Sequence, residues 1–182
     1  MTGRRIRFLT ALALGLFSLA SSAATLSGRV VAISDGDTVT VQDPRSKKHK
    51  IRLAGIEAPD SAQPYGDRSK QHLADLVLNQ SVSVEWQKYD AYGRKFGKIM
   101  VAGRHACPAL QPDCPRTLDV GLAQLVAGLA WHYRHTEGEQ RPQERAAYSF
   151  AEKVARRKHV GLWADTGPVP PWQWRNEHKL VK

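Results

Sequence analysis

Cysteine is scarce in this chain of 182 residues, which contains only Cys107 and Cys114. Two cysteines with one nearby histidine, His105, are too few for a closed zinc site, which takes four such ligands. The sequence also has no internal repeat and no change in composition that would mark a second domain. The length is that of one domain, and a hydrophobic content of 42% is enough for its core.

Long apolar runs are missing as well, apart from one at the N-terminus between Phe8 and Ala20. Three arginines precede this run, and the small residues Ser21-Ser22-Ala23-Ala24 follow it. The run is short for a membrane span, and the pattern is typical of a signal peptide, with an uncleaved anchor as the alternative. We expect cleavage after residue 24, a periplasmic or secreted protein, and no stable membrane partner afterwards.

Export bears on the interpretation of the two cysteines, which lie in a proline-rich loop from Cys107-Pro108 to Cys114-Pro115. In an exported protein an even number of cysteines indicates a disulfide. We therefore expect Cys107 and Cys114 to pair, and a metal site using His105 is the competing interpretation.

Acidic residues are outnumbered, with 17 Asp and Glu against 27 Lys and Arg, and the formal net charge is +10. Removing residues 1–24 takes away three arginines and no acid, so the net charge falls to +7. A basic surface serves solubility, or it attracts phosphate. Charge alone does not decide between these interpretations.

Four of the few carboxylates are concentrated in one stretch, in which Asp35-Gly36-Asp37 precedes a predicted strand and Glu57 and Asp60 follow another. If the two strands pair, these carboxylates can converge at one end of a sheet. Asp-Gly-Asp alone is typical of a hairpin turn, but the two acids downstream favour a site. Such a cluster repels itself unless it holds a cation, and all-oxygen ligands suit calcium or magnesium.

Arg52 lies between the two pairs of carboxylates, and its planar guanidinium is suited to a phosphate group. A metal ion, an arginine and a spare carboxylate are the parts of a metal-assisted phosphodiesterase. Beside this motif, the basic charge favours nucleic acid as the partner.

The alternation of apolar residues predicts a fold of the α+β class that is mainly β, a small antiparallel barrel with about three helices. The tail, residues 166–182, contains too many prolines for a helix, and we expect its tryptophans to pack on the body. In the last helix we expect Ala147, Phe150, Ala151 and Val154 to face inward. The expected strands are 26–34, 38–41, 49–53, 81–86 and 96–101, and the expected helices are 63–79, 118–126 and 143–159.

The motifs resemble those of the staphylococcal nuclease (thermonuclease) family, and the likeness runs from about Leu26 to Trp163. The resemblance implies an OB-fold for a nuclease domain at 25–165, a shape that commonly binds oligonucleotides. The matching motifs are Asp35-Gly36-Asp37-Thr38, Arg52-x4-Glu57-x-Pro59-Asp60, Tyr92-Gly93-Arg94 and Gly128-Leu129-Ala130.

The resemblance also implies an activity, which is calcium-dependent hydrolysis of DNA or RNA that leaves 3′-phosphate ends. We expect one Ca²⁺ per domain and a monomer. A nucleic-acid-binding module that has lost its chemistry is the alternative. The resemblance implies that Asp37, Glu57 and the Ala58 carbonyl are the metal ligands, with Asp35 in the shell behind them. It implies that Asp60 is the general base. Arg52 and Arg94 would bind the phosphate, and Tyr92 would lie beside the nucleotide. Tyr133 either belongs to the core or binds a substrate phosphate.

Two positions depart from the family, which has Asp where this chain has Glu57 and Glu where it has Asp60. The shorter Asp60 would fall short of its water by about 1.5 Å, one C–C bond. In one version, the longer Glu57 moves the ion and its water outward and so restores the contact between Asp60 and that water. In the other, Glu57 is itself the base and Asp60 is a metal ligand. Both versions predict that the two positions are coupled.

Overall fold

The computed structural model describes residues 24–103 and 114–179. The predicted signal peptide and Cys107 lie outside the described residues, so the cleavage site and the Cys107–Cys114 disulfide stay predictions. Within the described ranges, no helix combines the length and the apolar composition needed to cross a membrane.

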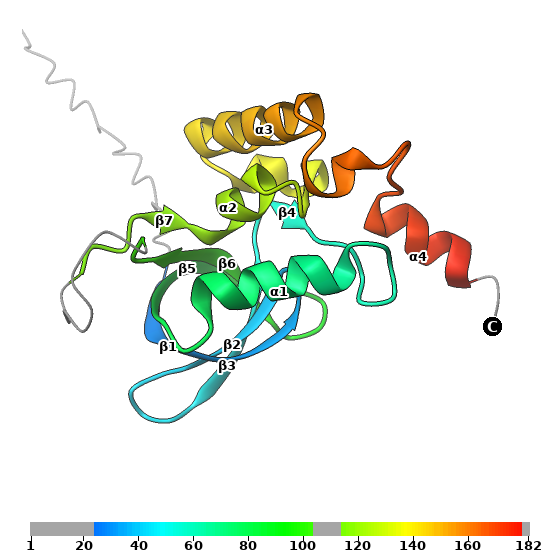
Figure 1. Ribbon diagram of the computed structural model, residues 1–182. Coiled ribbons are helices and arrows are strands. Elements are labelled where there is room, and N and C mark those ends of the chain that lie inside the picture. Colours follow the sequence, from blue (N-terminus) through cyan, green and yellow to red (C-terminus); the bar gives the residue numbers. More distant parts are fainter. Residues whose placement is uncertain (1–23, 104–113, 180–182) are drawn as a thin grey trace, which may run out of the picture.

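Five strands form a closed barrel, as Figure 1 shows. In the order β3-β2-β1-β5-β6, neighbouring strands pair antiparallel. The barrel closes where Ile51 of β3 pairs with Lys95 of β6, and this pair is parallel. The prediction of a five-stranded barrel is confirmed, although its closing pair is not antiparallel as expected. The strands are β1 (Ala24–Asp35), β2 (Thr38–Gln42), β3 (Lys48–Leu53), β5 (Ser81–Tyr89) and β6 (Lys95–Val101).

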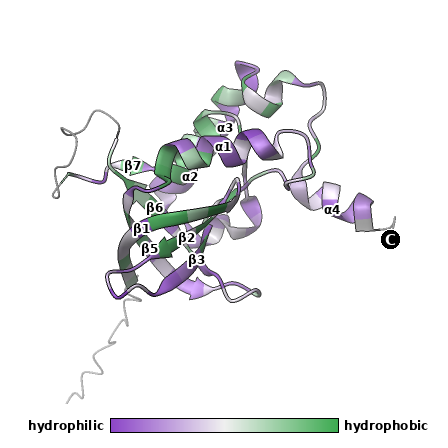
Figure 2. Cartoon of the chain, turned by 60° about the horizontal axis from the view of Figure 1, so that its bottom comes forward, coloured by the Kyte–Doolittle hydropathy of each residue, from purple (hydrophilic) through white to green (hydrophobic). Residues whose placement is uncertain are grey.

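The barrel interior is filled by aliphatic side chains that alternate along the strands. In β6, every second residue from Lys95 to Val101 is buried, which is the two-residue period of a strand with one face inside. In Figure 2, β1 and β5 show green hydrophobic segments, whereas β3 is largely purple. The core residues on the barrel strands are Val30, Val39, Val41, Ile51, Leu53, Val82, Val84, Ile99 and Val101.

The helices pack outside the barrel, and the three predicted ones differ from the predictions by up to three residues at their ends. Helix α1 (Gly66–Val77) begins later than expected, because residues 60–65 form turns. Helix α2 (Val120–Val126) is capped by Asp119, whose carboxylate accepts the Leu122 N–H at 3.1 Å. The predicted start at Leu118 is wrong, because Leu118–Asp119 instead forms β7, which pairs with β6.

Helix α3 (Pro142–Arg157) follows a short 3₁₀ helix, η1 (Arg134–Glu139). Its predicted inward face is partly wrong, because Phe150 is 64% exposed and Ala147 is exposed as well. The face that packs on the body is rotated and contains Tyr148, Ala151, Glu152 and Ala155.

The C-terminal tail forms α4 (Pro171–Lys179) after η2 (Gly161–Ala164), so the prediction of a non-helical tail is wrong. Pro171 opens the helix, and proline is tolerated there because the N–H of that position has no partner within the helix. Trp172 packs against a second core cluster that contains Trp131 and Trp163, as predicted. Trp174 instead stacks on His178 of its own helix, with ring centroids 3.7 Å apart.

Candidate active site

The structure gathers the four predicted carboxylates in a cleft of about 630 Å³ at one end of the barrel. Two short strands complete this end, because Glu57 of β4 (Ile56–Glu57) pairs with Trp131 of β8 (Trp131–His132). The predicted site residues that line the cleft are Asp35, Asp37, Arg52, Glu57, Ala58, Asp60, Tyr92, Arg94 and Tyr133.

Asp37 is held in place by hydrogen bonds from three directions. Its Oδ2 accepts the Ala58 N–H at 2.7 Å, and its Oδ1 accepts the Thr38 hydroxyl at 3.1 Å. Its own N–H donates to Asp35 Oδ1 at 3.0 Å, which places Asp35 behind it in the turn. Asp37 is only 4% exposed, so its ionised carboxylate depends on these donors and on an ion pair with Arg52.

The turn that carries Asp37 requires glycine at its centre. A Cβ on Gly36 would come within 2.0 Å of Ser69 Oγ on α1 and 2.6 Å of Ala58 Cβ. The Gly36 carbonyl also accepts the side-chain N–H of buried Gln124 at 2.6 Å. The Asp-Gly-Asp sequence thus fixes the first pair of carboxylates against two helices.

Glu57 and Asp60 have different surroundings. Glu57 is 4% exposed, and its Oε1 lies 3.9 Å from Arg52 Nη2. Asp60 lies on the following loop, where its side chain is 36% exposed and its N–H donates to Gln63 Oε1 at 3.2 Å. Asp60 is therefore the carboxylate with access to solvent, whereas Glu57 lies deeper.

Arg52 and Arg94 reach the cleft from the two strands whose parallel pairing closes the barrel. Burial lowers the pKa of Arg52, although the negative charges of Glu57 and Asp35 oppose this shift. Arg94 precedes β6, and its Nε lies 2.6 Å from Asp90 Oδ2. Its Nη1 donates to Thr38 Oγ1 at 3.3 Å, which directs the guanidinium toward the turn of Asp37.

The two tyrosines occupy the rim of the cleft. Tyr92 is 84% exposed, and the Arg94 guanidinium lies 5.3 Å from its ring centre. Tyr133 is half-buried and lines the cleft, whereas its neighbour Trp131 belongs to the core. Of the two alternatives for Tyr133, its position favours the cleft.

Arg175 of α4 is a site residue that the sequence did not predict. Its Nη1 lies 3.0 Å from Asp60 Oδ1, and its Nη2 forms an ion pair with Glu57 Oε1. Burial alone would lower the pKa of Arg175, but its bonds to these carboxylates raise it above its ordinary value. No local motif marks Arg175, since its partners are more than a hundred positions away in the sequence.

The donor chemistry of the cleft fits a hard cation, because Asp37 and Glu57 offer buried anionic oxygens. Within the described part of the chain, however, no three His, Cys, Asp or Glu side chains are arranged as a metal site. The guanidinium groups of Arg52 and Arg175 contact the carboxylates in this conformation. The assignment of the metal ligands therefore stays a prediction.

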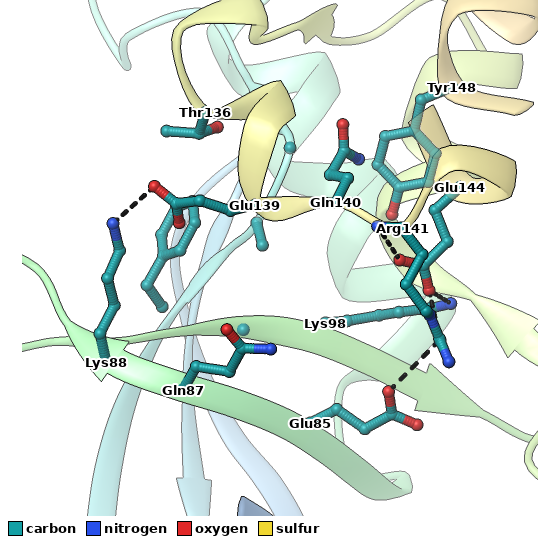
Figure 3. Close-up of a pocket in the computed structure, with 14 residues that line it drawn as sticks. Glu85, Gln87, Lys88, Lys98, Thr136, Glu139, Gln140, Arg141, Glu144 and Tyr148 are labelled. Atoms are coloured by element: carbon teal, nitrogen blue, oxygen red, sulfur yellow. Dashed lines mark hydrogen bonds and ion pairs between the residues drawn. The ribbon is translucent and has the colours of Figure 1, made fainter. Parts of the chain in front are cut away.

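A second cavity, of about 190 Å³, lies between β5, β6 and α3 (Figure 3). Its charged groups pair with one another. Lys98 Nζ lies 2.9 Å from Glu144 and 3.2 Å from Asp119, and Arg141 bonds the same Glu144 at 2.5 Å. A separate ion pair joins Lys88 to Glu139 at 2.7 Å. This cavity has the arrangement of a structural ion-pair network.

A closed five-stranded barrel with acids and arginines in one cleft is consistent with a nuclease of the OB-fold class. Residues 50–165 match the model of the family described as Staphylococcal nuclease homologue. The chain belongs to this family, as its motifs predicted.

Two of three similar proteins are described as nucleases. A "Micrococcal nuclease" from Shigella flexneri is 37% identical over 86% of this chain and 84% of its own length. An "Uncharacterized endonuclease" from Escherichia coli O157:H7 is 34% identical over 91% of this chain and 95% of its own length. "Protein ParB" from Escherichia coli is 38% identical over 92% of this chain and 89% of its own length. The chain is therefore a phosphodiester-hydrolysing nuclease with a nucleic-acid substrate.

Proposed function

We propose that this protein is an exported, calcium-dependent, monomeric nuclease that cleaves DNA or RNA and leaves 3′-phosphate ends. The observation that carries the proposal is the cleft itself, in which Asp37 and Glu57 lie buried beside Arg52. The family resemblance supports calcium as the ion, and the pattern of residues 1–24 supports export.

In this mechanism Asp37, Glu57 and the Ala58 carbonyl would hold the cation, and Asp35 holds the turn behind them. A bound calcium ion would supply polarisation of a phosphoryl oxygen and orientation of the attacking water. Asp60, the more exposed carboxylate, accepts the proton of that water. The water oxygen bonds to phosphorus, the bond to the 5′ oxygen breaks, and the leaving 5′ oxygen takes up a proton.

The two arginines stabilise the charge that develops during this displacement. The planar guanidinium groups of Arg52 and Arg94 bind the non-bridging oxygens of the scissile phosphate. Tyr92 on the exposed rim flanks the nucleotide, and Tyr133 bonds a substrate phosphate.

The test is incubation of plasmid and of RNA with the purified protein, in calcium and in chelator. We expect cleavage in calcium, none in chelator, and product 5′ ends that accept a kinase label without prior phosphatase treatment. Asp37→Asn is the control, because it keeps the side-chain shape and removes the charge. Equal cleavage in chelator would contradict the metal assignment, and an intact mass that includes residues 1–24 after expression with export would contradict cleavage of the signal.

A further inference from the structure

Helix α4 places a positive charge against two carboxylates of the cleft. Arg175 contacts both Glu57 and Asp60, the proposed cation ligand and the proposed base. Charge-assisted bonds of this kind are among the stronger hydrogen bonds in proteins. In this conformation the tail therefore neutralises part of the carboxylate cluster from within the same chain.

A divalent cation bound at Glu57 and Asp60 would meet the positive charge of Arg175, which already contacts an oxygen of each carboxylate. A calcium ion approaches its carboxylate ligands to about 2.3–2.6 Å, which would bring it close to the guanidinium already bonded to Glu57 Oε1. The cluster also holds Arg52, so a cation bound beside both arginines would meet two like charges. One of the cations has to leave, and the arginine on the more exposed element is the candidate.

We propose that Arg175 and a divalent cation compete for Glu57 and Asp60, so that α4 releases its arginine when the cleft binds the cation. The proposal rests on the proposed function, because it takes Glu57 as a cation ligand. It makes Arg175 a site residue that regulates metal binding and that lies beyond the part of the chain matched by the family model.

The construction of α4 suits such a release. The helix is nine residues long, and a helix of this length is marginal without tertiary contacts. Asn176, Glu177 and His178 are exposed, and in Figure 1 the helix lies at the periphery of the molecule. Apart from Arg175, the helix is held at its first turn, by buried Pro171 and by Trp172, whose ring lies 5.7 Å from that of Tyr133.

The connection before α4 allows the helix to change position. Gly167 has φ 71°, a conformation that favours glycine, and a Cβ there would meet no atom within 4 Å. Upstream, Tyr65 bonds Asp165 at 2.9 Å, and downstream the side chain of Gln63 donates to the Val169 carbonyl at 2.6 Å. Movement of α4 therefore has to begin after Asp165, at Gly167 or beyond the Val169 contact.

The test is calorimetric titration of calcium into the protein without nucleic acid. If α4 is docked in about 90% of molecules, Arg175→Ala should tighten the apparent calcium Kd about tenfold, because the competing state is lost. Two controls should leave the Kd within about twofold. Gln173→Ala alters another contact of the same helix, and Arg157→Ala removes one positive charge from an exposed position of α3. Calcium binding to Arg175→Ala that is equal to or weaker than wild type would overturn the inference.

Hydrogen exchange gives a second measurement on the unmodified protein. Calcium should accelerate exchange of the backbone amides at 173–179 and leave those of the barrel strands protected. Unchanged or greater protection of α4 in saturating calcium would also overturn the inference. Tighter calcium binding by Arg175→Ala without any plasmid cleavage would contradict the proposed function alone. Calcium-dependent cleavage with an unaltered Kd would contradict this inference alone, and absence of calcium binding would contradict both.

Discussion

The active-site cleft and the second cavity both contain acids and bases, but they combine them differently. In the cavity of Figure 3, Glu144 of α3 forms ion pairs with Lys98 of β6 and with Arg141, which precedes α3. In the cleft, Asp37 and Glu57 are almost fully buried and face arginines that also border open space. Charges that are paired at a half-exposed surface stabilise modestly, whereas buried carboxylates beside a cleft are typical of a functional site. The difference lies in burial and accessible space, because both regions contain both signs of charge.

The largest effect should come from removing the first carboxylate of the cleft. Asp37→Ala should abolish calcium-dependent hydrolysis and leave the barrel folded but less stable, because buried Arg52 and the Ala58 N–H lose their partner while only the repulsion from the other acids is relieved. Asp37→Asn should be equally inactive and more stable than Asp37→Ala, since it keeps acceptors for the N–H of Ala58. Plasmid cleavage and thermal melting measure the two effects. Hydrolysis at the wild-type rate by either variant would remove Asp37 from the metal site.

The next effect concerns the geometry of the guanidinium in the cleft. Arg52→Lys should be nearly as damaging as Arg52→Ala, because lysine keeps the charge and loses the planar pair of donors. Each should lower the rate roughly 10²-fold or more, the scale of losing one preorganised donor. Steady-state kinetics in calcium provide the measurement. A rate close to wild type for Arg52→Lys would indicate that Arg52 only attracts the substrate.

Exchanging the carboxylates at positions 57 and 60 should change the hydrolysis rate less than the substitutions above. Glu57→Asp alone should lose activity, Asp60→Glu alone should gain little, and the double exchange should recover at least the wild-type rate. The measurement is a double-mutant cycle on the hydrolysis rate, with a coupling of at least about 0.5 kcal/mol expected for interacting residues. Additive effects would refute the coupling. Strong activation by Asp60→Glu alone would instead identify Asp60 as a base that is too short.

The smallest effect lies in the second cavity and should alter stability without altering hydrolysis. Bonds to Arg141 and Lys98 outweigh burial and lower the pKa of Glu144 from 4.5 to about 2. Because the folded pKa is depressed, the stability from Glu144 is present above pH 4.5 and is lost as the pH falls toward 2. Glu144→Gln should therefore melt a few degrees below wild type at pH 7, since a half-exposed pair contributes roughly 0.2–1 kcal/mol. The melting difference should be smaller at pH 3 and should disappear only near or below pH 2, where the folded carboxyl is itself protonated. A difference at pH 3 as large as that at pH 7 would mean that packing is the cause.

The short motifs at the strand ends located residues that line one cleft, and the roles assigned to these residues stay predictions. Asp35 and Asp37 are held by their own turn, and Glu57 and Asp60 follow β3 within a few residues. Arg175 was missed because its contacts span more than a hundred positions and nothing local marks them. The face of α3 was misjudged because Phe150 is apolar yet exposed, and periodicity cannot tell which of two neighbouring apolar stripes packs.

The parallel pairing of β3 with β6 has a consequence for how activity can be lost. This seam joins residues that are distant in sequence, with Arg52 opposite Phe96 and Arg94 immediately before the paired segment. A local opening of the seam would separate the two arginines while β1, β2 and β5 kept their antiparallel partners. Mild heat or denaturant should therefore abolish hydrolysis before the barrel loses its secondary structure. Activity then measures whether the β3–β6 pair is closed rather than whether the whole protein is folded.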